Sequence, residues 1–302
     1  MNQRVTPSDL KVLWRDTGVF EAPRWDGADA LYFANVTAGG VHRLDLRSGT
    51  VQCVVPYRRG IGGFALTERV DFVVSGRNIA LKRAGYDATE ILFSSDGLDL
   101  PVIGFNDLAV DNSGRLVVGA LGPGALNPKT LTGREPAPAT GAGTGAVYYQ
   151  AVQGWRQVAD DIGHPNGIGF STDGCLAYVS DSLRRIVYRF VVGASGWSER
   201  IEFARFEQGL PDGVAVASDD SVWVASALAG ELVVLEPDGS IRTRYIMPTH
   251  LTTSVSFGGD DLRTVFVTAG SHDGTDPALV ASFRSPVAGR TMPRALDFMQ
   301  RQ

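Results

Sequence analysis

The sequence HPNGIGFSTDG, residues 164–174, is followed by the apolar run CLAYV at residues 175–179. Apolar residues alternate with small ones through its first half, and this period of two predicts a half-buried strand. Ser, Thr, Asp and Gly then supply a tight turn before the second apolar run. The stretch therefore predicts two strands joined by a short turn.

The same pattern recurs five more times along the chain. The segments are EAPRWDGADALYF from residue 21, GGFALTERVDFVV from 62, NDLAVDNSGRLVV from 106, DGVAVASDDSVWV from 212 and TSVSFGGDDLRTVFV from 253, aligned with NGIGFSTDGCLAYV from 166. In all six, the third residue is apolar or Pro and the fifth is large and apolar. The fourth residue is small in every segment except the first, which has Arg24.

Repeats of about 40 to 60 residues built from short strands are typical of a β-propeller. Six repeats predict an all-β, six-bladed β-propeller that forms a single domain over residues 1–302. We expect a strand at 10–14 to complete a blade begun at the C-terminus, because such closure removes sheet edges. A strand at 146–149 is assigned to the fourth blade, and the tail from Arg290 is expected to be frayed.

The segment at 121–145, GPGALNPKTLTGREPAPATGAGTG and its flanks, is rich in Gly and Pro and interrupts the regular spacing. Loops of this length in compact domains are usually functional or disordered. Two interpretations stay open, a surface loop and a lid over the channel mouth.

Composition narrows the function. With 44% hydrophobic and 20% charged residues, the chain reads as a globular protein, and a net charge of −5 without Lys/Arg clusters argues against a nucleic-acid partner. No signal peptide and no long apolar run are evident, so we expect a cytoplasmic protein with no membrane partner. Cys53 and Cys175 lie in apolar strand patterns and are expected to be buried free thiols.

The first column of the aligned repeats carries the chemistry. It holds Glu21, Gly62, Asn106, Asn166, Asp212 and Thr253, which a propeller would bring to one depth around its channel. Two carboxylates and two amide oxygens would neutralise and coordinate one divalent cation. Such an oxygen set suits Ca²⁺ best, then Mg²⁺ or Mn²⁺, and leaves Zn and Fe open. Asn-Gly and Asp-Gly pairs taken singly are more often simple turns.

The motifs EAPRW, FNDLAVDNSGRL, HPNGIGFSTDG with YVSDS, LPDGVAVASDDSVWVAS and FGGDDLRTVFVT occur in an order and at a spacing that resemble the SMP-30/gluconolactonase/LRE-like family. The resemblance implies a six-bladed propeller with one catalytic divalent metal in its channel. It implies Glu21, Asn166 and Asp212 as metal ligands and Asn106 as a contact to metal or substrate. It also implies Asp212 as the base or nucleophile.

Two positions depart from the family pattern. Gly104 stands where sugar-lactone members have an Arg that binds the polar substrate, and Ala217 stands where an Asp usually ends the DGxAVD motif. Phe20, Ile61, Phe64, Ile103 and Phe105 adjoin the first column, so they either make the mouth apolar or belong to the core. Phe105 is retained as a candidate substrate contact. His164 and His250 precede first-column residues and are candidates for a second acid or a substrate contact, with a structural role as the alternative.

These features predict a divalent-metal-dependent hydrolase of the lactonase type, which opens a small cyclic ester less polar than a sugar lactone. Asp212 would act as base, and the partner would be a small-molecule substrate. A phosphotriesterase, or a hydratase or dehydratase, could use the same site. A propeller used only for binding is the remaining alternative, and it predicts no bound cation.

Overall fold

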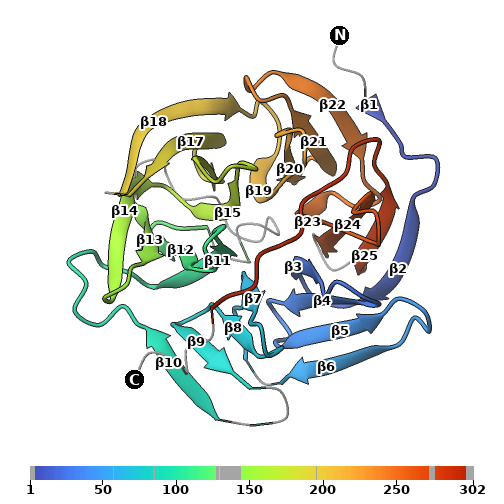
Figure 1. Ribbon diagram of the computed structural model, residues 1–302. Coiled ribbons are helices and arrows are strands. Elements are labelled where there is room, and N and C mark those ends of the chain that lie inside the picture. Colours follow the sequence, from blue (N-terminus) through green and yellow to red (C-terminus); the bar gives the residue numbers. More distant parts are fainter. Residues whose placement is uncertain are drawn as a thin grey trace.

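The structure is a computed structural model of residues 1–302. It describes residues 4–56, 58–83, 86, 88–126, 129, 144–194, 196–271 and 276–296. All of its named elements are strands, and they are arranged radially around a central channel (Figure 1). The prediction of an all-β propeller architecture is confirmed.

Four of the sheets have four strands each, and neighbouring strands within them are antiparallel. The first contains β3 (Phe20–Trp25), β4 (Ala30–Asn35), β5 (Val41–Asp45) and β6 (Val51–Val55). The second contains β7 (Phe64–Leu66), β8 (Phe72–Val74), β9 (Ile79–Lys82) and β10 (Thr89–Phe93). The third contains β11 (Gly104–Val110), β12 (Leu116–Leu121), β13 (Gly145–Gln150) and β14 (Trp155–Ile162). The fourth contains β15 (Pro165–Phe170), β16 (Leu176–Asp181), β17 (Ile186–Gly193) and β18 (Gly196–Arg205).

The remaining strands form one nine-stranded sheet with two arms. One arm contains β19 (Leu210–Val216), β20 (Val222–Ala227), β21 (Glu231–Leu235), β22 (Ile241–Ile246) and β1 (Arg4–Val5). The other contains β23 (Leu251–Gly258), β24 (Thr264–Gly270), β25 (Ala278–Arg284) and β2 (Lys11–Asp16). A single residue pair, Ala227 with Leu251, joins β20 to β23. Hydrogen bonding thus gives four separate blades and one larger sheet, where six separate blades were predicted.

The predicted ring closure is confirmed, because β2 pairs antiparallel with β25. The strand expected at 146–149 is present as β13, but its assignment to the fourth blade is wrong. It pairs with β12 and β14 in the third sheet. The outer strands β14, β18 and β22 were not predicted. Most of their residues are exposed or half-buried, so their sequences lack the continuous apolar signal of the inner strands.

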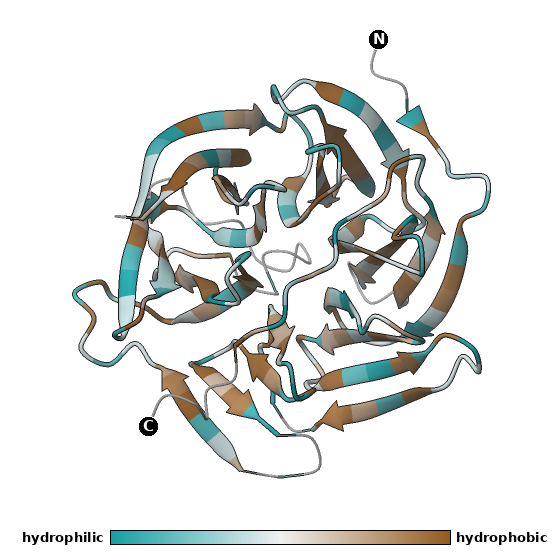
Figure 2. Ribbon diagram, in the orientation of Figure 1, coloured by the Kyte–Doolittle hydropathy of each residue, from teal (hydrophilic) through white to brown (hydrophobic). Residues whose placement is uncertain are grey.

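Apolar side chains from neighbouring sheets pack together and form the core. Tyr32, Phe64 and Phe72 join the first sheet to the second, while Phe105, Leu108 and Tyr148 pack with β8 and β9. In Figure 2, the outer strands alternate between hydrophobic and hydrophilic residues, as expected where one face is buried and the other solvated. This packing fixes the inner strands around the channel.

The segment 285–296, here called the C-terminal strap, crosses one end of the channel from the β23–β25 arm towards β7 (Figure 1). Its backbone and arginine side chains form hydrogen bonds with every sheet of the ring. The partners are Leu262, Ser218, Phe170, Ser171, Asn112, Thr67, Leu66, Gly114 and Asp26. The expectation of a frayed tail is therefore wrong for residues 290–296, and residues 297–302 lie outside the described part of the chain.

The two cysteines are exposed, which overturns the prediction of buried thiols. Cys53 lies on β6, the outermost strand of its sheet, and Cys175 lies in the turn before β16. An apolar sequence context does not specify which face of an edge strand is covered. Among the described residues, no helix has the length and apolar character needed to cross a membrane.

Candidate functional site

The first-column residues lie at or just before the beginning of the six innermost strands. Five of these strands carry a β-bulge at this level, because the inner strand has one more residue than its partner between successive pairs. The bulged positions include Glu21, Asn106, Asn166, Asp212 and Thr253. A bulge bends a strand and re-aims its side chains, and bulges are common beside active sites. The repeated motif thus places one irregularity, and one first-column side chain, in each of these inner strands.

Three carboxylates interact at this end of the channel. Burial, reinforced by the charges of Asp212 and Asp107, raises the pKa of Glu21 well above its ordinary value. Burial, together with the charge of Asp107, raises the pKa of Asp212 in the same way, although hydrogen bonding from Asn166 opposes the shift. Like charges held together out of water favour protonation or a bound cation.

Asp107 is an acidic member of this cluster that the sequence reasoning missed. Burial raises the pKa of Asp107 to about 6, although the guanidinium of Arg24 lowers it. The closest atoms of this ion pair, Arg24 Nη2 and Asp107 Oδ1, are 3.8 Å apart, and both side chains are largely buried. The only signals were the Asp beside Asn106 and the single large residue in the fourth column.

Arg24 also ties the inner strands together. Its Nε donates to the carbonyl oxygen of Phe64 at 3.1 Å, and its Nη2 donates to that of Leu108 at 3.2 Å. Arg24 interacts with Glu21 and Asp107, and Asp212 interacts with both Glu21 and Asp107. Three ionised carboxylates and one guanidinium leave an excess of two negative charges, which equals the charge of one divalent cation. The charge balance therefore fits the predicted cation.

Asp212 provides the most specific indication of a missing ligand. The residue is 3% exposed, and its Oδ1 has no hydrogen-bond donor among the residues that the structure describes. An unpartnered, buried charged oxygen is costly. A metal ion would satisfy the free lone pairs of this oxygen.

Asn166 is held in position beside Asp212. Its Nδ2 donates to Ser182 Oγ at 3.1 Å, and Ser182 Oγ donates to the carbonyl oxygen of Pro211 at 2.7 Å. Because the amide nitrogen is fixed in this way, its carbonyl oxygen remains as an acceptor. Gly167 permits the close approach of β15 and β19, since a Cβ there would lie 2.3 Å from the backbone oxygen of Asp212. The amide is thus preorganised as a ligand.

His164 and Asn106 are in contact. His164 Nε2 lies 3.3 Å from Asn106 Nδ2, and Asn106 Nδ2 donates to the carbonyl oxygen of Pro165 at 3.1 Å. The other ring nitrogen, Nδ1, accepts the N–H of Leu126 at 3.0 Å. Burial lowers the pKa of His164 to about 4, so the ring is neutral and its proton is on Nε2. In this tautomer Asn106 Nδ2 and His164 Nε2 are both donors, so their contact is not a hydrogen bond and the Nε2–H of His164 is left to donate to another group at the site.

Two other candidates are not brought into this cluster. The His250 side chain is exposed, and its carbonyl oxygen accepts the N–H of Gly230. Phe105 is 2% exposed and packs its ring 5.1 Å from that of Phe93 in the core. Phe105 faces the core because neighbouring residues of a strand point to opposite sides. It is a packing residue and not a channel contact.

The apolar neighbours used to predict an apolar mouth also belong elsewhere. Phe20, Ile61 and Phe64 are buried in the core, and Ile103 is 60% exposed. A different apolar cluster forms near the start of the inner strands, two residues before the first column in three of them. Its members are Val19, Val36, Leu126, Leu183, Leu210, Ala227 and Leu251. In the sequence, three of these apolar residues could have been found two positions before the first column, at Val19, Leu210 and Leu251.

Leu126 belongs to the Gly/Pro-rich segment and packs beside the candidate site. It is buried among these leucines and its N–H is bound by His164. The two ends of the segment, at Leu121 and Gly145, continue β12 and β13. Residues 127, 128 and 130–143 lie outside the described part of the chain, so the lid hypothesis is not tested there.

The residues present fit a hard, oxygen-seeking cation. Glu21, Asp212, Asn106 and Asn166 offer carboxylate and amide oxygens, which Ca²⁺, Mg²⁺ and Mn²⁺ prefer. In the described ranges, no group of three or more His, Cys, Asp and Glu side chains has the geometry of a metal site, in keeping with a donor set that is half amide. The predicted centre would be an oxygen cluster with two charged and two neutral ligands.

Comparison with known proteins identifies the family. The SMP-30/Gluconolactonase/LRE-like region matches residues 19–271. The chain belongs to this family. Among the family's proteins, 6-deoxy-6-sulfogluconolactonase of Pseudomonas putida is 32% identical over 86% of each chain. Pentonolactonase XacC of Haloferax volcanii is 30% identical and is covered to 92%, with 90% of this chain aligned.

A solved structure of a family protein supports the fold. Regucalcin of Agrobacterium tumefaciens strain C58, described as a calcium-binding protein, superposes with a TM-score of 0.81. It is 23% identical to this chain, and the superposition covers 97% of this chain and 99% of that one. At this identity the likeness concerns the fold. The predicted membership of the SMP-30/gluconolactonase/LRE-like family is confirmed.

Proposed function

We propose that this protein is a divalent-metal-dependent lactonase, which opens a small cyclic ester less polar than a sugar lactone. Its relatives named as lactonases support the reaction class. The observation that most supports a bound metal is the Oδ1 of Asp212, which has no partner among the described residues and lies within a cluster of three carboxylates and one arginine. We also infer that the two arms of the nine-stranded sheet act as the fifth and sixth blades, since one residue pair joins them.

Glu21, Asp212, Asn106 and Asn166 would hold the cation, with Ca²⁺ as the preferred ion. When bound, the cation supplies Lewis-acid chemistry and stabilises negative charge on the ester oxygen. Asp212, whose pKa is raised by burial, would accept the proton of the attacking water. The proton then passes to the ring oxygen as its bond to the acyl carbon breaks, and a hydroxy acid results.

His164 would orient the substrate. Its Nε2–H donor lies beside Asn106, and its Nδ1 is held by Leu126. A neutral donor can bind an ester oxygen without adding charge to the site. His164 therefore acts as a substrate contact in this proposal, and it does not serve as an acid at neutral pH because its pKa is about 4.

The apolar cluster near the mouth supports a substrate with few hydroxyl groups. Leu126, Leu183, Leu210 and Leu251 have no donor or acceptor to offer a sugar ring. Gly104 likewise offers no side chain, and a Cβ there would lie 3.2 Å from the backbone oxygen of Gly76. Unpaired hydroxyls would lose their hydration without compensation, whereas an alkyl substituent would gain by burial.

A lactone panel tests this function. Hydrolysis of gluconolactone and of alkyl-substituted γ- and δ-lactones is measured at equal metal concentration. We expect higher kcat/KM for the alkyl lactones, and we expect Leu126→Ser to reduce that preference about tenfold. Turnover of phosphotriesters with no lactone turned over would replace the lactonase proposal with the alternative reaction. A cytoplasmic location stays a prediction from the sequence.

A further inference from the structure

A cavity lies in the channel beyond the oxygen cluster. It has a volume of about 110 Å³ and is lined by residues further along the same inner strands. All six fourth-column residues contribute to its wall: Arg24, Ala65, Ala109, Gly169, Ala215 and Ser256. Because five of the six are small, the side chains that would otherwise fill the channel axis are missing at this level.

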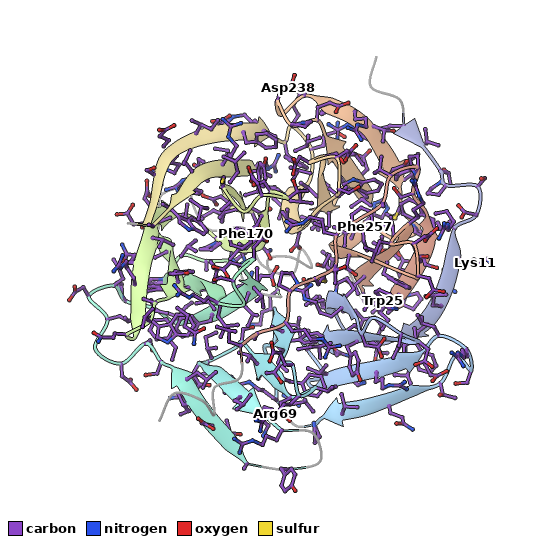
Figure 3. The ribbon with its side chains drawn as sticks, viewed as in Figure 1. Lys11, Trp25, Arg69, Phe170, Asp238 and Phe257 are labelled. Atoms are coloured by element: carbon purple, nitrogen blue, oxygen red, sulfur yellow. The ribbon has the colours of Figure 1, made fainter. Side chains whose placement is uncertain are left out.

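The C-terminal strap closes this cavity from the opposite end. Residues 290–294 form part of the wall. Arg290 anchors the strap by donating from Nη1 to the carbonyl oxygens of Phe170 and Ser171, both at 2.7 Å. Figure 3 shows Trp25 and Phe257 around the central channel together with Phe170, and Figure 1 shows the strap passing across it. The cavity is therefore built from the whole ring and its C-terminus.

Two buried polar atoms of this wall have no partner among the described residues. They are the indole Nε1 of Trp25 and Oγ of Ser256, and Ser256 is only 1% exposed. An unsatisfied buried donor or hydroxyl is destabilising, and such groups normally bind water or a ligand. These two atoms indicate that the cavity holds a molecule with a hydrogen-bond acceptor.

The charges around the cavity favour an anion. Arg24, Arg290 and Arg294 line it, and no Asp or Glu does so within the part of the chain that the structure describes. Arg24 is paired with Asp107, but Arg290 and Arg294 form no ion pair among the described residues. Arg290 donates only from its two Nη atoms, so its Nε–H remains available. Asp173 and Asp220 are near enough to affect the pKa of Arg290, yet they form hydrogen bonds to other residues.

We propose that this cavity is a binding site for a small organic carboxylate with an apolar body. The carboxylate would meet Arg290, Trp25 Nε1 and Ser256 Oγ, and the apolar part would contact Phe170 and Phe257. A cavity of about 150 Å³ binds benzene, which has six heavy atoms, so a cavity of about 110 Å³ suits a small carboxylate of similar size or smaller. The site shares Arg24 with the oxygen cluster but none of the proposed metal ligands, and it does not depend on the proposed reaction.

Thermal unfolding of the full-length protein with butyrate or 1-butanol tests the proposal, at constant ionic strength adjusted with sodium chloride. We expect a saturable rise in Tm with butyrate, about 2 to 3 °C at tenfold excess over Kd, and a much smaller rise with butanol. Equal responses to the two compounds, or no response to butyrate, would overturn the proposal and leave water as the occupant.

Three variants locate the effect. Ala215→Leu fills the cavity and is expected to abolish the butyrate response, and Ser256→Ala is expected to weaken it without changing the volume. Arg290→Gln keeps amide donors but removes the charge, so butyrate should lose its advantage over butanol. A full butyrate response in both Ala215→Leu and Arg290→Gln would place the anion elsewhere, for example at the oxygen cluster, and would contradict the assignment.

Discussion

The two ends of the channel are built from the same six strands but differ in charge and in packing. At the start of the strands, Glu21, Asp107 and Asp212 interact with one another, and Arg24 pairs with Asp107. One carboxylate oxygen of Asp212 has no partner among the described residues. Three residues further on, the side chains are small and the wall contains arginines and no acid. One repeated motif can thus specify a charged site in one column and an empty space in another.

The largest expected effect concerns the acidic end. Asp212→Asn should lower lactone kcat by about a thousandfold or more, because it removes both a cation ligand and the proposed base. The same change should raise the stability of metal-free protein, since a neutral amide replaces a buried carboxylate. Steady-state kinetics and urea unfolding measure the two effects. Asp219→Asn, on the exposed turn of the same hairpin, should leave kcat unchanged and should not raise stability, because it weakens the pair with Arg242.

The arginine between the two halves carries the next largest effect. Arg24→Met leaves Asp107 without its cation and leaves the carbonyl oxygens of Phe64 and Leu108 without a donor. Breaking a buried pair in this way costs about 3 to 5 kcal/mol. Urea unfolding measures the loss. Arg47→Met is the control, because Arg47 is 83% exposed and pairs with Asp29 at the surface. Equal small losses in the two variants would argue against a buried ion pair.

His164 predicts a pH dependence of stability. Its pKa is about 4 in the folded protein, against about 6.5 when unfolded. Between these pH values the histidine is protonated in the unfolded chain but neutral in the folded protein. The free energy of unfolding is therefore highest above pH 6.5 and falls as the pH drops to 4. The loss amounts to about 3 kcal/mol. Urea unfolding at several pH values should show this slope in the wild type relative to His164→Gln. Parallel curves would mean that the ring titrates normally.

A smaller effect tests the empty end. Ala215 is half-buried and lines the cavity at the edge of a core cluster, whereas Ala217 is fully buried within that cluster. Ala215→Leu should therefore leave the free energy of unfolding nearly unchanged, while Ala217→Leu should lower it by about 1 to 3 kcal/mol through overpacking. Chemical denaturation of both variants makes the comparison. Similar losses would show that no usable space exists beside Ala215.

The propeller architecture was predictable because each repeat contains two apolar strand patterns joined by turn residues. Apolar residues at period two locate the inner strands, and the β2–β25 closure follows from unpaired strand patterns at the two ends. The joining of β20 to β23 was not predictable, since it rests on one backbone pair between Ala227 and Leu251. The C-terminal strap lacked a signal because its arginine side chains bind carbonyl oxygens and it forms no regular ladder.

The candidate site was predictable only by column. The first-column oxygens were visible in the alignment. In a regular strand with its period of two, however, the side chain of Asp107 would point to the opposite side from that of its neighbour Asn106. The bulge between Phe105 and Leu108 breaks that period and lets both residues act on the same cluster. The cavity could not be predicted either. Small residues in the fourth column leave a cavity only if no other segment fills the space, and the position of the C-terminal strap was not predictable.

The most direct test of the central claim is lactone hydrolysis by metal-free protein during titration with Ca²⁺, with bound metal measured by elemental analysis at each point. We expect activity to be absent at the start, to rise in proportion to bound metal and to saturate at one equivalent, and we expect Asp212→Asn to retain neither metal nor activity. Full lactone hydrolysis by protein shown to be free of divalent metal would contradict a metal-dependent reaction.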